Sequence, residues 1–166
     1  MLRSLIVLPA VALLAASLVA CTPAANEATS GADVATPRNP FFGTWEVTRA
    51  RIAPWLKEGE PEPEADPDFT RFSLQADASS GPPLLTCKDP QYATNMVSPR
   101  GLFEGNLPDP VADATALGFA SPDITMLSFS CKSGTADVGV DFAMLDDGQI
   151  MLGLDNVIYT FSRTGD

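Results

Sequence analysis

The sequence predicts an all-β domain, a small antiparallel β-barrel or sandwich of about seven or eight strands with one short helix and one disulfide. Three observations support this prediction. Short runs that alternate apolar and polar residues recur between turns rich in Gly, Pro and Asp. A single segment carries both helix start and stop signals. Cys87 and Cys131 form an even pair in the second half of the chain.

The first predicted strand covers Thr44–Arg51, in which Trp45, Val47 and Arg49 would share one face. Two shorter apolar runs are also expected to be strands, Phe69–Leu74 and Leu84–Cys87. In the segment 92–107, the apolar residues are interrupted by Pro-Arg-Gly. This pattern is compatible with a hairpin and with a lid, and it does not choose between them.

The second half of the chain predicts a long strand followed by an antiparallel meander. Ile124–Cys131 alternates apolar and small polar residues along its length. Asp146-Asp147-Gly148 and Asp155-Asn156 are tight-turn signals that separate consecutive strands. The three strands of the expected meander are Val138–Leu145, Ile150–Leu154 and Val157–Arg163.

The expected helix is Asp109–Leu117, which has a signal at each end. Asp109 can cap it, Pro110 suits its first turn, and Gly118 can end it.

Residues 1–20 have the features of a secretory signal peptide, because Arg3 precedes an apolar run that ends in small residues. The alternative is an uncleaved membrane span, but such a span needs roughly 20 apolar residues and this run is shorter. Leu18-Val19-Ala20-Cys21 resembles the lipobox of bacterial lipoproteins. The resemblance implies cleavage before Cys21, acylation of Cys21 (palmitate among the acyl groups) and anchoring in the cell envelope. Thr22 in place of aspartate implies the outer membrane, facing the periplasm.

The mature chain is therefore expected to begin with a lipidated N-terminus and flexible tether, residues 21–40. The tether is rich in Ala, Thr, Asn and Pro and has no apolar periodicity. A single β domain, residues 41–166, follows it. In an exported, oxidising compartment the most direct use of Cys87 and Cys131 is one disulfide. A redox or metal-binding pair is the alternative, but the chain has no CxxC spacing and no histidine.

The composition argues against several classes of function. A formal net charge of −11 argues against nucleic acid as a partner, since phosphates require clustered Lys and Arg. Without histidine, no Ser-His-Asp or Cys-His arrangement can form, and zinc loses its commonest ligand. Nothing in the chain singles out a carboxylate pair for catalysis. We therefore expect a non-catalytic protein with no catalytic residues, cofactor or metal site.

Phe42-Gly43-Thr44-Trp45 resembles the Gly-x-Trp signature of the calycin superfamily, the lipocalins and fatty-acid-binding proteins. The resemblance implies that Trp45 closes one end of a barrel. It also implies that Arg163, late in the last strand, packs across the indole as a cation–π partner. Gly43, Trp45 and Arg163 are thus the expected barrel-end signature. A barrel of this size either holds a small ligand or is filled by its own side chains.

The expected function is that of a lipid-anchored envelope protein that binds a small apolar ligand, as lipocalins do. One alternative is a protein-interaction module, such as a periplasmic inhibitor of a cationic hydrolase. Ser133-Gly134 is similar to part of the Ser/Gly loop of membrane-bound lysozyme inhibitors. A structural envelope lipoprotein is the other alternative. The acidic, Pro-rich segment 58–68 is expected to be an extended charged loop, with a cationic partner or Ca²⁺ as alternatives.

Overall fold

The computed structural model describes residues 38–133 and 136–165. These residues belong to one compact unit, Pro37–Asp166. The predicted signal peptide, Cys21 and most of the predicted tether lie outside the described residues, as does Gly134.

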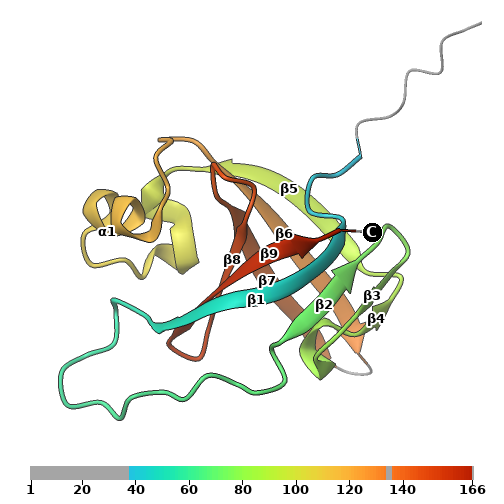
Figure 1. Cartoon of the computed structure of the whole chain (residues 1–166), viewed down its shortest axis with the longest axis horizontal. Helices are drawn as coiled ribbons and strands as arrows, with labels where there is room; N and C mark the ends of the chain where they lie inside the picture. The colour runs from blue at the N-terminus through green and yellow to red at the C-terminus, as the bar shows by residue number, and fades with distance from the viewer. Residues whose placement is uncertain (1–37, 134–135, 166) are drawn as a thin grey trace, which may run out of the picture. The chain divides into compact units, whose positions relative to one another are not determined.

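A single antiparallel sheet of nine strands, in the order β4-β3-β2-β1-β9-β8-β7-β6-β5, forms the domain (Figure 1). The sheet curls into a half-barrel, so the predicted all-β barrel-like class is confirmed. The strands are β1 (Gly43–Ile52), β2 (Arg71–Leu74), β3 (Ala78–Ser80), β4 (Cys87–Lys88), β5 (Gln91–Val97), β6 (Ile124–Ser133), β7 (Ala136–Met144), β8 (Ile150–Leu154) and β9 (Val157–Thr164).

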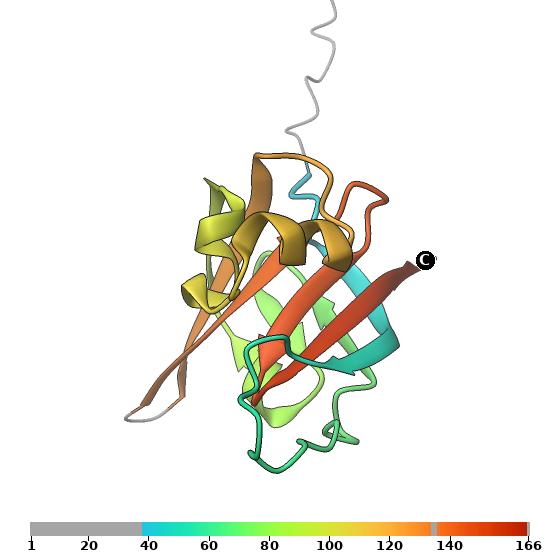
Figure 2. The ribbon, with the colours of Figure 1, turned by 90° about the vertical axis from the view of Figure 1, so that its left-hand side faces the viewer.

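The α-helix α1 (Pro110–Leu117) forms where its end signals predicted it. The Asp109 side chain accepts a hydrogen bond from the Ala112 N–H, and Gly118 ends the helix in the left-handed conformation. Two 3₁₀ segments accompany it, η1 (Pro83–Leu85) and η2 (Pro99–Gly105). Both η2 and α1 lie over one end of the sheet (Figure 2).

A disulfide joins β4, at one end of the sheet, to β6, which lies next to the other end. Cys87 on β4 and Cys131 on β6 form the predicted disulfide, and both side chains are buried. No ladder of backbone hydrogen bonds links β4 to β6 in the described residues. The disulfide therefore closes the curled sheet at a place where strand pairing does not.

Side chains pack on both faces of the sheet. The concave face holds one cluster around Trp45, Phe129 and Phe142. The convex face holds a second cluster under α1 and η2, which includes Met126 and Met151. Alternation along β6 explains the division, because successive residues of a strand point to opposite faces.

Several expectations about the strands were wrong in detail. Leu84–Cys87 is not one strand, because Pro83 begins a 3₁₀ turn and only Cys87 enters β4. Pro suits the first turn of a helix and cannot donate to a sheet ladder. The segment 92–107, for which the sequence left both a hairpin and a lid open, contains most of strand β5 and then η2. With β3 also unforeseen, the sheet has nine strands.

The prediction that Arg49 shares a face with Trp45 and Val47 was also wrong. Val47 pairs with Phe161 and Arg49 with Thr160, so the ladder is interrupted at Thr48 by a β-bulge. A bulge inserts one residue and reverses the alternation beyond it. Arg49 therefore shares a face with Thr160, opposite to the face that carries Val47.

We predict that replacing both cysteines (Cys87→Ala/Cys131→Ala) lowers the free energy of unfolding by about 4 kcal/mol. The disulfide spans 44 residues, and its removal frees the unfolded chain from that loop constraint. Denaturant unfolding of the mature chain measures the loss. Reductant should bring the wild type to the midpoint of the variant and leave the variant unchanged, whereas equal midpoints in oxidised and reduced wild type would contradict the prediction.

Candidate functional site

At one end of the barrel, Trp45 is fully buried beneath Arg163. The Arg163 guanidinium carbon lies 4.5 Å from the centre of the indole ring. The indole N–H donates to the Phe41 carbonyl at 2.8 Å, and Arg163 donates to the carbonyls of Phe42 and Pro40. These hydrogen bonds hold the residues just before β1 across the barrel end.

Gly43 is required at this barrel end for two reasons. Its φ of +145° is rarely adopted by other residues. A Cβ atom at this position would also lie 2.5 Å from Nη1 of Arg163. The structure thus brings Gly43, Trp45 and Arg163 into one contact group.

The barrel interior is filled by its own aromatic side chains. Trp45, Phe129, Phe142 and Phe161 are all at most 1% exposed. Phe72 packs against both Phe142 and Phe161, with ring centroids 5.3 Å and 4.9 Å apart. A ligand site is therefore to be sought elsewhere than the barrel interior.

The larger of two hollows on the described residues is a slot in the barrel wall where β7 and β8 diverge. The two strands pair only from Phe142 to Met144, opposite Leu152 to Ile150. Earlier residues of β7 pair with β6 alone, and the β6–β7 hairpin projects from the body of the sheet (Figure 2). The slot has a volume of about 710 Å³ and is lined by both separated strands, by β6 and by η2.

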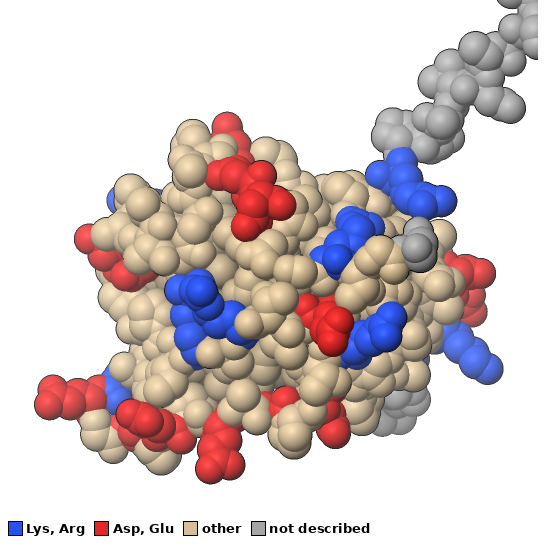
Figure 3. All heavy atoms as spheres, viewed as in Figure 1, with Lys and Arg blue, Asp and Glu red and all other residues tan. Residues whose placement is uncertain are grey.

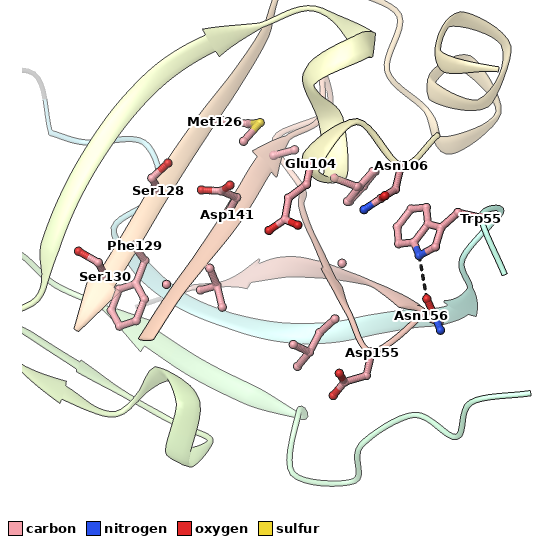
Figure 4. A pocket seen from close by; sticks show the side chains of 16 residues that line it. Trp55, Glu104, Asn106, Met126, Ser128, Phe129, Ser130, Asp141, Asp155 and Asn156 are labelled. Carbon is pink, nitrogen blue, oxygen red and sulfur yellow. Dashed lines mark hydrogen bonds between the residues drawn. The ribbon is translucent and has the colours of Figure 1, made fainter. Parts of the chain in front are cut away.

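Two aromatic side chains form one wall of the slot. Trp55 and Phe103 lie with ring centroids 5.4 Å apart. The Trp55 indole N–H donates to Oδ1 of Asn156 at 2.9 Å, which fixes the orientation of the ring (Figure 4). Gly153 permits the close packing, because a Cβ there would lie 2.8 Å from Cδ1 of Phe103 and 3.4 Å from Trp55.

Polar side chains enter the slot from the remaining elements. Ser128 and Ser130 extend from β6, Asp141 from β7 and Glu104 from η2 (Figure 4). Asp155 lies in the β8–β9 turn. The other lining residues are apolar or amides: Asn106, Met126, Phe129, Val140, Ala143 and Leu154, besides glycine.

The backbone around the slot is unusual. Five non-glycine residues in the described part of the chain have positive φ, and four of them line the slot. Phe103 and Glu104 have positive φ in η2. Asp155 and Asn156 have positive φ in the β8–β9 turn. Asn and Asp adopt this conformation readily, but Phe and Glu do so at an energetic cost. Packing of the Phe103 ring on Trp55 and Gly153 offsets that cost.

A second, smaller hollow of about 400 Å³ lies at the barrel end. Arg38 and Arg163 line it, and none of its lining residues is acidic. The two hollows therefore differ in the sign of their charged side chains.

The acidic segment 58–68 is an exposed stretch between β1 and β2, and acidic side chains gather at the corresponding corner of the molecule (Figure 3). Its backbone is held at one point, where the Asp66 N–H donates to the Tyr159 hydroxyl at 2.8 Å. Within the described ranges, no group of three or more Cys, Asp or Glu residues is arranged to hold a metal ion.

Two ionisable groups outside the slot have shifted pKa values. Burial raises the pKa of Tyr92 to about 12. Burial, and next the nearby Arg49, lower the pKa of Arg51. Arg51 donates to the Leu117 carbonyl at 3.4 Å, at the negative end of α1, and so ties the helix to the sheet.

The sequence pointed to the barrel end and not to the slot. Among the slot residues, the sequence singled out Asp155-Asn156, which it predicted to form a tight turn. Trp55, Phe103 and Asp141 lie far apart in the chain, and no motif relates them. The slot exists because two strands separate, which is a property of strand pairing between distant segments.

Searches of protein-family models, curated proteins and solved structures found no match to the chain. In residues 38–133 and 136–165, no helix has the length and apolar character needed to cross a membrane.

We predict that Gly153→Ala displaces Phe103 and lowers the free energy of unfolding by about 1–3 kcal/mol through overpacking. The emission of Trp55 should change, because its aromatic neighbour moves. Gly139→Ala is the matched control, since a Cβ there meets only the Phe129 carbonyl, at 3.7 Å. Denaturant unfolding and tryptophan fluorescence measure both variants. Equal stability and equal emission for the two would contradict the prediction.

Proposed function

We propose that the protein is a lipid-anchored, non-catalytic binding protein of the bacterial envelope that holds a small, largely apolar ligand in the slot between β7 and β8. The slot itself carries this proposal. Its volume of about 710 Å³ lies within the range of small-molecule sites, about 300–1,000 Å³. Its lining combines an aromatic wall with seven polar or charged side chains, so it offers apolar surface for a ligand and polar groups that can orient it.

The slot suits a ligand better than the barrel interior does. Aromatic side chains fill the interior, whereas the slot keeps Trp55 and Phe103 only partly buried. An apolar ligand that covered these rings would remove their exposed surface from water. The proposal therefore keeps the ligand class expected from the calycin resemblance and moves the ligand to the barrel wall.

The proposed lipid anchor would hold the protein at the membrane, so the domain would need no membrane-binding surface of its own. Acyl chains on Cys21 would contribute about 0.8 kcal/mol per buried methylene, so two or more chains give stable anchoring. The alternatives, a protein-interaction module for a cationic partner and a structural envelope lipoprotein, stay predictions.

For the anchor, we predict that the full precursor incorporates labelled palmitate when it is produced in a bacterium. Cys21→Ser should abolish labelling and move the protein from the membrane to the soluble fraction. Cys87→Ala is the matched control, because it removes a different cysteine and leaves Cys21 in place. Labelling that survives Cys21→Ser would contradict the proposed anchor.

For the slot, we predict saturable binding of decyl maltoside, below its micellar concentration, by the mature chain carrying Cys21→Ser. We expect an affinity of roughly 10–100 µM, which corresponds to about 0.2 kcal/mol per heavy atom of decyl maltoside, below the roughly 0.3 kcal/mol per atom of drug-sized ligands. Calorimetry gives the affinity, and tryptophan fluorescence reports on Trp55. Gly139→Phe places a ring against the slot and should weaken binding by about tenfold or more.

Ser80→Phe is the matched control, because it adds the same bulk at an exposed position of β3 outside the slot. Circular dichroism checks that both variants keep their strands. Non-saturable binding, or equal binding by Gly139→Phe and Ser80→Phe, would overturn the placement of the ligand.

A further inference from the structure

We infer that the slot selects ligands that carry a cationic group, such as an organic ammonium, beside their apolar body. This inference rests on the proposed function and adds the charge of the ligand to it. Its basis is the convergence of carboxylates and aromatic rings from separate elements on one cavity.

Three carboxylates reach the slot from different parts of the fold. Glu104 comes from η2, Asp141 from β7 and Asp155 from the β8–β9 turn. All three residues are exposed, and none of their carboxylates accepts a hydrogen bond from another described residue. No Lys or Arg belongs to the lining. The slot thus presents negative charge that the described protein groups around it leave unpaired.

Other aspartates of the chain are used differently. Asp109 accepts the N–H that caps α1, and Asp146 and Asp147 accept backbone N–H groups beside turns. Those carboxylates stabilise local structure. Asp141, in the middle of a strand, has no such local role, and its side chain extends into the slot (Figure 4).

The aromatic wall complements the carboxylates. The faces of indole and phenyl rings carry negative potential and attract cations, most strongly in the case of tryptophan. Trp55 is held by Asn156, and Phe103 packs beside it at 5.4 Å between centroids. Rings for an apolar body and carboxylates for an ammonium group therefore line the same cavity.

The hollow at the barrel end provides an internal contrast. Arg38 and Arg163 line that hollow, so an anionic group would be favoured there and disfavoured in the slot. A fatty-acid carboxylate in the slot would face Glu104, Asp141 and Asp155 without a compensating cation among the lining residues. Charge complementarity therefore separates cationic from anionic ligands of equal chain length.

Three probes with the same decyl chain test the inference on the mature chain carrying Cys21→Ser: decyltrimethylammonium, decyl maltoside and decanoate, all below their micellar concentrations. We expect decyltrimethylammonium to bind about tenfold more tightly than decyl maltoside, and decanoate to bind most weakly. The preference for the cation should shrink as salt is added, because exposed charges are screened.

Asp141→Asn/Asp155→Asn removes two charges with little change in shape, and Asn tolerates the positive φ at position 155. This variant should lose most of the preference for the cation, measured as the ratio of its affinities for decyltrimethylammonium and decyl maltoside. Glu62→Gln/Glu64→Gln makes the same change of charge in the exposed acidic segment and should keep the preference.

The outcomes distinguish this inference from the proposed function. Binding of decyl maltoside with no preference for the cation overturns the inference alone. Absence of saturable binding by all three probes overturns the proposed function as well. Equal loss of preference in the two double variants shows a general charge effect and also overturns the inference.

Discussion

A covalent link between β4 and β6 closes a sheet that strand pairing leaves open. The described sheet has two ends, at β4 and β5, and neither is joined to the other by a backbone ladder. An open, curled sheet would expose its aromatic concave face to water. The Cys87–Cys131 disulfide holds β4 against β6, and Phe72, Phe129 and Phe142 pack behind it. The filled interior depends on this closure, because an apolar core is stable only where water is excluded.

The filled interior is the reason that the proposed ligand site lies on the barrel wall. Trp45 and Arg163 seal one barrel end, and the rings behind Trp45 occupy the remaining space. Apolar surface that a ligand could cover lies instead on the wall, at Trp55 and Phe103. A small barrel can be packed with its own side chains, and this one is.

The slot arises because β7 and β8 pair over only part of their length, and neighbouring elements pack where the two strands separate. β7 follows β6 along its whole length but leaves β8 after three pairs of residues. The strained turn in η2 brings Phe103 over Gly153 at the point where the strands separate. The β8–β9 turn supplies Asn156, which holds Trp55. The proposed site would be largely preformed, so a ligand would have little to order on binding.

The sequence alone determined the features that depend on neighbours in the chain. The cap of α1 at Asp109, the Asp155-Asn156 turn and the alternation of β6 follow from local hydrogen bonding and side-chain direction. Of the three cysteines, the sequence predicted that Cys87 and Cys131 pair because Cys21 belongs to the predicted lipobox. The contact of Trp45 with Arg163 was anticipated through the family resemblance.

Only the tertiary structure decided the bulge at Thr48, the extra strands β3 and β5, and the separation of β7 from β8. Each depends on the register between segments far apart in the chain, which no local pattern encodes. The candidate slot belongs to this second group. Its rings and carboxylates become neighbours only when the sheet has curled, because distant strands then bring to one place residues that are unrelated in sequence.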